Sequence, residues 1–182
     1  QKTGLKKSIK TILYAGNIGK GQGLEKVIPV IAKSLGFEYQ IKIIGDGGSI
    51  SLLRDLINKE NIQNVELISP VGRIELTKYY LEADILFLHL NNIPAFKRVL
   101  PSKIFEYAAL GRPIVAGLNG YSAKFMRQNI PHALIFPPGD SKGAVKCILD
   151  STNIKVSRNI VNEFVSKYLR VSIMDELTHE LI

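Results

Sequence analysis

The stretch VLPSKIFEYAALGRPIVAG, residues 99–117, contains a complete helix-to-strand unit. Pro and Ser at 101–102 begin a helical pattern, and Gly-Arg-Pro at 111–113 ends it just before an apolar run. Lys103 and Glu106 are three residues apart, on one side of the expected helix. Because charged side chains are rarely covered without a reason, this pair in a small, apolar helix predicts a role at the edge of a sheet.

The rest of the chain repeats this alternation of apolar strands and helical patterns. Strands are predicted at residues 10–16, 39–45, 64–69, 84–90, 112–117 and 132–136. Helices are predicted at residues 24–36, 50–61, 74–83, 121–129 and 141–150, in addition to the helix of the opening stretch. The remainder, 153–182, is predicted to form C-terminal helices with a break near Arg170.

Strands that are almost continuously apolar indicate a parallel sheet covered on both faces. We therefore expect one α/β domain over residues 1–182. Its predicted fold is Rossmann-like: a doubly wound, parallel six-stranded sheet with helices on both faces.

The composition fits a single globular domain. Apolar residues make up 46% of the 182 residues, and no apolar run approaches the roughly 18 residues that a membrane helix needs. The polar and basic start, residues 1–8, looks like a connector and has no apolar core of a signal peptide. Cys147 is the single cysteine, and no Cys/His spacing indicates zinc. We expect a cytoplasmic protein without a metal or another cofactor.

The formal net charge of +8 favours an anionic partner. Nucleic acid, an anionic membrane surface and an anionic small substrate all fit such a charge. Lys and Arg are spread along the chain, and no cluster interleaves them with aromatic residues as single-strand binders do. This distribution disfavours nucleic acid. It leaves open an anionic substrate and a peripheral contact with the inner face of the membrane.

Loops after the first three strands are candidate ligand contacts, because doubly wound sheets bind ligands beyond the carboxyl ends of their strands. GNIGKGQG, residues 16–23, fits a phosphate loop or a flexible turn, and it matches neither the dinucleotide fingerprint nor the P-loop. In GDGGS, residues 45–49, Asp46 either caps the next helix or binds a hydroxyl group. In SPVGRI, residues 69–74, Arg73 either grips a phosphate or is an ordinary surface charge.

The loop after the fourth strand, NNIPAFKRVLPSK, places the cations Lys97, Arg98 and Lys103 close in sequence. Ser102 is the expected N-cap, which would leave free N–H groups and a positive dipole end pointing outward. Glu106, one turn later, can accept two hydrogen bonds from a vicinal diol such as a ribose. The alternative is an ordinary surface pair with Lys103, worth only a few tenths of a kcal/mol.

Several glycine turns and cations therefore face one edge of the predicted sheet, and this edge suits an anionic, phosphate-bearing nucleotide. No Ser-His-Asp set, Cys-His set or pair of catalytic carboxylates is found at these loops. His89 and His132 fall at the ends of strands, where we expect structural roles.

Four segments, in this order, resemble one enzyme family: ILYAGNIGKGQGLEKVI, IIGDGGSISLLRDL, VELISPVGRIELTKYYLEADILFLHL and VLPSKIFEYAALGRPIVAG. They are similar to the C-terminal, donor-binding domain of GT-B glycosyltransferases of family 4 (group 1), over roughly residues 8 to 180. The first and last segments look most like bacterial transferases that build surface polysaccharides.

This resemblance implies a nucleotide-sugar donor on the domain. The family's Glu at the position of Glu106 binds the ribose, and backbone N–H groups around Ser102 and Lys103 hold the diphosphate. The loop at Gly16 faces the diphosphate, and the segment from Val71 to Arg73 passes the base. The full set of predicted donor-binding residues is Gly16, Asn17, Lys20, Gly45, Asp46, Val71, Arg73, Ser102, Lys103 and Glu106.

The sequence departs from the common family pattern in three places. Arg98 falls where the family has a Glu that contacts the donor sugar, so the resemblance does not fix the sugar. Asn17 and Gln22 fall where it has a phosphate-binding Arg and Lys, and Lys20 or Lys103 is expected to supply that charge. The family's acceptor-binding half, with its usual catalytic His, is an N-terminal domain with no counterpart here. We therefore expect half of a longer, two-domain enzyme.

The expected activity is a retaining transfer of a sugar from a UDP-linked donor to a polysaccharide or a lipid-linked acceptor, without a metal. The catalytic residues on the acceptor side are expected in the N-terminal partner domain, so the domain alone should be inactive. Two alternatives remain: a nucleotide-sugar epimerase of the same fold and a non-catalytic nucleotide-binding module.

Overall fold

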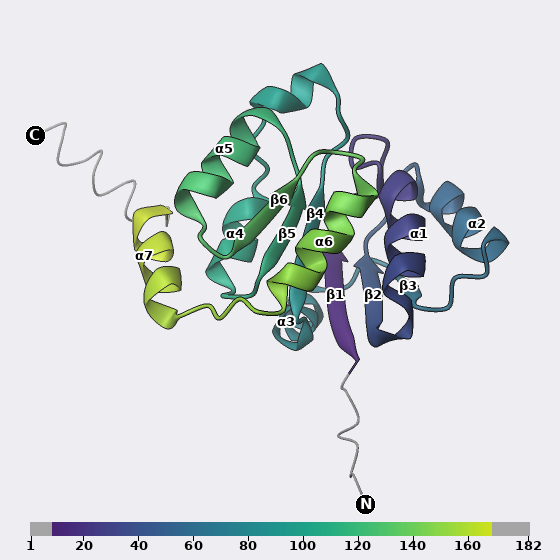
Figure 1. Ribbon diagram of the computed structural model, residues 1–182, viewed down its shortest axis with the longest axis horizontal. Helices are drawn as coiled ribbons and strands as arrows, with labels where there is room; N and C mark the ends of the chain where they lie inside the picture. Colours follow the sequence, from purple (N-terminus) through teal and green to yellow (C-terminus); the bar gives the residue numbers. More distant parts are fainter. Residues whose placement is uncertain (1–8, 169–182) are drawn as a thin grey trace, which may run out of the picture.

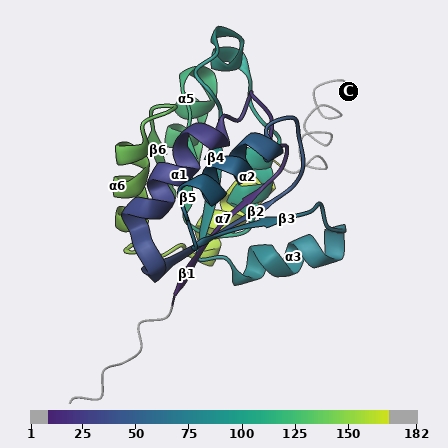
Figure 2. The ribbon, with the colours of Figure 1, turned by 90° about the vertical axis from the view of Figure 1, so that its right-hand side faces the viewer.

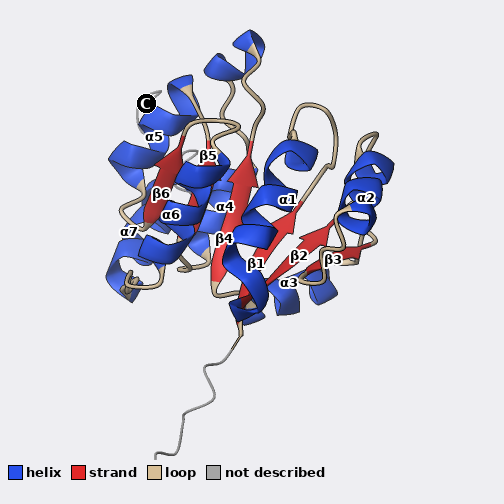
Figure 3. Cartoon of the chain, turned by 45° about the vertical axis from the view of Figure 1, so that its right-hand side comes forward, coloured by secondary structure: helices blue, strands red, loops and turns tan. Residues whose placement is uncertain are grey.

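A parallel sheet of six strands, in the order β3-β2-β1-β4-β5-β6, forms the middle of the protein (Figure 1). The computed structural model describes residues 9–168. The strands are β1 (Lys10–Ala15), β2 (Tyr39–Ile44), β3 (Val65–Ile68), β4 (Ile85–His89), β5 (Ile114–Gly117) and β6 (Ala133–Phe136). All six point the same way, so that the loops after them lie along one edge of the sheet (Figure 3).

A helix follows each strand, an additional helix ends the described chain, and the helices cover both faces of the sheet. They are α1 (Leu24–Leu35), α2 (Ile50–Lys59), α3 (Arg73–Glu82), α4 (Lys103–Ala109), α5 (Gly120–Asn129), α6 (Ser141–Ser151) and α7 (Arg158–Tyr168). Two short 3-10 helices, η1 (Gly36–Glu38) and η2 (Pro94–Arg98), lie in the connections. Figure 2 shows α1 and α6 on one side of the sheet and α3 on the other.

The predicted fold class is confirmed, and every predicted strand and helix before residue 152 lies within two residues of its expected bounds. The prediction of continuous helix from residue 153 is wrong for residues 153–157, which form a turn and a segment without regular secondary structure. The end of α6 explains this, because the hydroxyls of Ser151 and Thr152 donate to carbonyls of the last turn. The basic start at 1–8 and the break expected near Arg170 lie outside the described residues.

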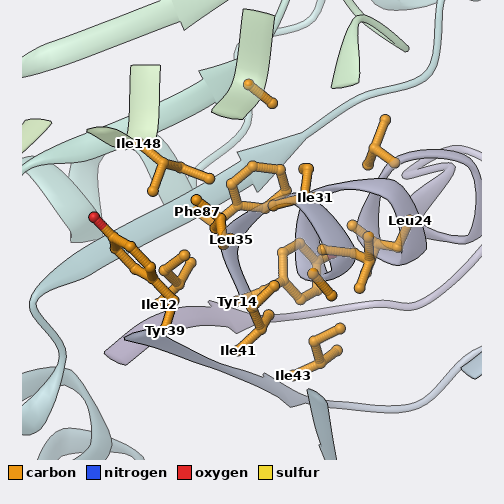
Figure 4. Packing of buried hydrophobic residues seen from close by; sticks show 14 of the residues in the cluster. Ile12, Tyr14, Leu24, Ile31, Leu35, Tyr39, Ile41, Ile43, Phe87 and Ile148 are labelled. Carbon is orange, nitrogen blue, oxygen red and sulfur yellow. The ribbon is translucent and has the colours of Figure 1, made fainter. Parts of the chain in front are cut away.

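Alternate residues of the central strands fill two separate cores. In β1, Ile12 and Tyr14 pack into a core under α1, α2 and α6, which Figure 4 shows from close by. Leu13 and Ala15 face the opposite core, formed with α3, α4, α5 and α7. This burial on both faces explains the nearly continuous apolar strands of the sequence. No helix between residues 9 and 168 is long and apolar enough to cross a bilayer.

Two buried histidines differ in the hydrogen bonds of their ring nitrogens. The N–H of Gly139 donates to Nε2 of His89 at 3.0 Å, so the ring proton is on Nδ1, which donates to the carbonyl of Gln22. His89 thus ties together the loops after β1, β4 and β6. His132, before β6, is equally buried, but neither ring nitrogen has a hydrogen-bond partner among residues 9–168. Burial lowers the pKa of both rings.

We expect opposite effects from His89→Leu and His132→Leu. The first leaves two backbone groups unpaired and should cost about 1–3 kcal/mol of stability, whereas the second removes an unpaired polar ring and should be neutral or stabilising. Because burial lowers the folded pKa values of both rings, the unfolded chain binds these protons at a higher pH than the folded protein does, so the protein loses stability as the pH falls below about 6.5, the unfolded value.

Urea unfolding at pH 7.5 and 5.5 measures both effects. His132→Leu should reduce the loss of stability between these two pH values. A loss as large as in the unchanged protein would contradict the assignment of a buried, neutral His132.

Candidate nucleotide-binding site

A pocket of about 330 Å³ opens at the carboxyl ends of β1 and β2, beside the first residue of α4. This volume is at the lower end of the range for small-molecule sites, roughly 300–1,000 Å³. The walls come from the loops after β1, β2 and β3 and from α3 and α4, and the lining residues are Ala15, Gly16, Asn17, Ile44, Gly45, Asp46, Pro70, Val71, Leu76 and Lys103.

Six of the ten residues predicted to bind the donor line this pocket: Gly16, Asn17, Gly45, Asp46, Val71 and Lys103. The other four, Lys20, Arg73, Ser102 and Glu106, are not among its lining residues. Arg73 instead borders a separate hollow of about 780 Å³ under α3, next to Lys42 and Tyr79. The structure therefore brings the loops after β1, β2 and β3 together with Lys103, but it does not place every predicted side chain at the pocket.

The pocket lies at the switch point of the sheet, where the strand order turns from β1-β2-β3 to β4-β5-β6. β1 pairs with β4 only through Ile12 and Leu13, so the two strands separate toward their carboxyl ends. Tyr107 of α4 fills this separation, and its hydroxyl accepts a hydrogen bond of 3.1 Å from the N–H of Ala15. The fully buried Tyr107 ring therefore fixes α4 against the end of β1.

Backbone hydrogen bonds lock the two glycine-rich loops against each other. The N–H of Gly16 donates to the carbonyl of Ile44 at 2.9 Å, and that of Ile18 donates to the carbonyl of Asp46 at 2.8 Å. A Cβ added to Gly45 would overlap the carbonyl oxygen of Gly16. Gly45, one of the predicted donor-binding residues, thus lies in close contact with the other loop.

Asp46 keeps an exposed carboxylate at the pocket wall. Its Oδ1 accepts a hydrogen bond of 2.7 Å from the N–H of Gly47, in its own loop. The side chain does not cap α2, whose N-cap residue is Ser49. Of the two expected roles, helix cap or hydroxyl ligand, the structure removes the first, and no residue from 9 to 168 bonds Oδ2, which can serve the second.

Asn17 and Gln22, at the two positions where the resemblance led us to look for an Arg and a Lys, form an uncharged pair of amides. Nδ2 of Asn17 donates to Oε1 of Gln22 at 2.8 Å, and the N–H of Gly19 donates to the same oxygen at 3.2 Å. Lys20, between them, has an exposed side chain, and its carbonyl accepts from Nδ2 of Asn91. The loop after β1 is thus held in shape by amides and brings no cation to the pocket lining.

Lys103 supplies the positive charge in the pocket wall. Its Nζ lies 2.6 Å from Oε2 of Glu106 and 3.2 Å from the hydroxyl of Tyr80. Burial alone would lower the pKa of Lys103, but the hydrogen bonds to Glu106 and Tyr80 outweigh it and raise the pKa above its usual value. The ammonium is therefore fully charged at neutral pH.

Ser102 is the N-cap residue of α4, as predicted, although its backbone angles are helical and its side chain makes no capping hydrogen bond. The first turn closes instead through the N–H of Ile104, which donates to the carbonyl of Pro101 at 3.0 Å. Within residues 9–168, no acceptor is found for the backbone N–H groups of Ser102 and Lys103.

Tyr80 and Tyr107 are the site residues that the sequence did not reveal. Both lie in helices whose patterns are otherwise ordinary, and their partners are far away in the chain. The available signal was the tyrosine itself in each helix, since a buried hydroxyl usually requires a hydrogen-bond partner. In the described part of the chain, no group of three His, Cys, Asp or Glu residues is arranged to hold a metal ion.

Comparison of the sequence with known proteins identifies one family. The sequence model described as glycosyl transferases group 1 matches residues 1–164. Over 113 residues, the chain is 29% identical to an Escherichia coli K12 protein with the name colanic acid biosynthesis glycosyl transferase WcaI. The match covers 62% of this chain and 28% of WcaI.

Solved structures share the fold at low sequence identity. Anabaena HepE, in complex with UDP and glucose, has a TM-score of 0.75 at 15% identity, with coverage of 98% of this chain and 49% of HepE. The pneumococcal O-GlcNAc transferase GtfA, in complex with UDP and GlcNAc, has a TM-score of 0.72 at 14% identity, with coverage of 95% and 37%. This chain thus spans half or less of the length of these relatives.

The contact between the two glycine loops predicts different outcomes for two nearby substitutions. Gly45→Ala should destabilise the protein by about 1–3 kcal/mol, because its Cβ would force the backbone of Gly16 to move. Gly48→Ala is the matched control, since nothing lies within 4 Å of an added Cβ at that position. Urea unfolding of both variants tests this packing, and equal stabilities would contradict it.

Proposed function

Because the chain belongs to the glycosyl transferases group 1 family, we propose that its pocket binds the nucleotide diphosphate-sugar donor of a glycosyltransferase. The observation that carries this proposal is the ammonium of Lys103, held in the wall of a pocket at the switch point of the sheet. Doubly wound sheets bind nucleotides at that point, and a diphosphate requires a positive charge there.

The diphosphate would lie between Lys103 and the loop at Gly16. The Nζ of Lys103 and the free N–H groups of Ser102 and Lys103 can donate to its oxygens. In the transfer reaction, this positive charge would stabilise the diphosphate as it leaves the sugar. A metal-free site is part of the proposal, because these groups supply the positive charge.

The nucleoside would occupy the side of the pocket toward β3. Pro70, Val71 and Leu76 form an apolar wall that suits the face of a base. Glu106, 43% exposed, keeps one carboxylate oxygen free of its ion pair and can accept from a ribose hydroxyl. We propose UDP as the nucleotide, with support from the UDP that HepE and GtfA hold in their complexes.

The whole enzyme would have a second domain that brings the acceptor and the catalytic residues. This part of the proposal is supported by the size of the relatives, since the match covers 49% of HepE and 28% of WcaI. The name of WcaI supports a polysaccharide or lipid-linked glycan as the acceptor, and retention of configuration is the stereochemistry we propose. The net charge of +8 supports work at the cytoplasmic face of an anionic membrane.

Substitution of the charged pair tests the donor site. Glu106→Gln keeps the shape but weakens the acceptor, so UDP affinity should fall by about 1.5–3 kcal/mol. Lys103→Met removes the cation and should weaken UDP far more than uridine, which has no phosphate. Calorimetric titration of the 182-residue chain with both ligands gives the affinities, and urea melts give the stabilities.

The surface pair Lys33–Glu60 provides the matched control. Its Nζ–Oε2 distance is 3.0 Å, and Glu60→Gln should leave UDP binding unchanged. If Lys103→Met and Glu106→Gln lower stability but leave UDP affinity unaltered, the pair is structural and the donor site is elsewhere.

A further inference from the structure

We propose that Tyr80 is a positioning residue, which holds the ammonium of Lys103 at the wall of the pocket in the geometry that a diphosphate requires. This inference rests on the proposed donor site. It adds a residue outside the pocket lining, on a different helix from Lys103.

The Tyr80 side chain is in the right place for this role. Tyr80 is 4% exposed, and its hydroxyl accepts a hydrogen bond of 3.2 Å from Nζ of Lys103. Its ring meets the ring of Tyr107 edge-on, with centroids 5.8 Å apart. Tyr107 is itself hydrogen-bonded to the N–H of Ala15. The Tyr80 ring therefore packs against a side chain that is fixed to the end of β1.

The surroundings of Nζ leave one donor for a ligand. An ammonium has three N–H groups, and Lys103 directs one to Tyr80 and one to Glu106. Nζ also lies 5.9 Å from the ring centroid of Tyr80 and 6.0 Å from that of Tyr107, within the range of cation–π contacts. Among residues 9–168, the third N–H group has no acceptor, and because Lys103 lines the pocket this group is available to a ligand there.

Glu106 alone does not provide this orientation. The Glu106 side chain is 43% exposed, and an exposed pair of one helix turn constrains its partners weakly. Tyr80, by contrast, is the only buried residue of α3 and reaches Lys103 from that separate helix. Two partners on different elements fix a flexible lysine far better than one, which reduces the entropy lost on binding.

Tyr80→Phe tests the role of the hydroxyl and keeps the ring against Tyr107. We expect UDP affinity to fall about 3- to 10-fold, the usual value of one net hydrogen bond, with little change in uridine affinity. The matched control is Tyr79→Phe, on the same helix, because the Tyr79 ring packs under the ammonium of Lys42 and Tyr79 is not among the residues that line the pocket. This control should bind UDP as the unchanged protein does.

A double-mutant cycle with Lys103→Met separates positioning from a general effect on the fold. If Tyr80 acts through Lys103, Tyr80→Phe should have no further effect on UDP affinity once the lysine is gone. An equal effect in both backgrounds, or an unchanged UDP affinity in Tyr80→Phe itself, overturns the inference and leaves the donor site intact. Failure of the unchanged protein to bind UDP overturns the donor site, and the inference with it.

Discussion

The hydrogen bond from the N–H of Ala15 to the hydroxyl of Tyr107 sets the geometry of the site. A parallel sheet must leave the end of β1 without a neighbour where β4 turns away, and an unpaired buried N–H there would cost about 1–3 kcal/mol. Tyr107 satisfies this group from α4, so the helix that carries Lys103 and Glu106 begins at a fixed place beside the pocket. The need to give the N–H of Ala15 an acceptor thus also positions Lys103 and Glu106.

Rigidity in the loops has a different origin from rigidity in α4. The loops after β1 and β2 are joined by main-chain hydrogen bonds, and the amides of Asn17 and Gln22 close the first loop on itself. Neither arrangement brings a cation to the pocket, so its positive charge is concentrated on Lys103. A single oriented charge in a half-buried place acts more strongly than several flexible ones in water, because the local dielectric response is weaker.

The sequence predicted the fold well because the signals for it are local. The pattern of apolar residues and the turn residues located all six strands. The rule that doubly wound sheets bind ligands beyond the carboxyl ends of their strands placed Gly16, Asp46 and Lys103 at one edge. Sequence reasoning failed where the deciding contact was distant or subtle. The partners of Tyr80 and Tyr107 are 23 and 92 residues away, and no local pattern indicates such contacts. The helix break at 153–157 follows from the hydroxyls of Ser151 and Thr152, which donate to carbonyls in the last turn of α6. The periodicity of apolar residues carries no information about such hydrogen bonds.

The ion pair between Lys103 and Glu106 is compatible both with a role in folding and with a role in nucleotide binding. An i,i+3 pair at this exposure contributes on the order of 0–1 kcal/mol, so it stabilises the helix only slightly. Hydrogen bonds to charged groups are worth more, about 1.5–3 kcal/mol, and an incoming diphosphate or ribose would form them with these same side chains. The pair therefore keeps both charges solvated and oriented beside the pocket, and we expect a ligand to share or replace it at little cost in free energy. This explains why a lysine and a glutamate can lie at the carboxyl-end edge of the sheet: each side chain pairs with the other until a ligand forms stronger contacts with them.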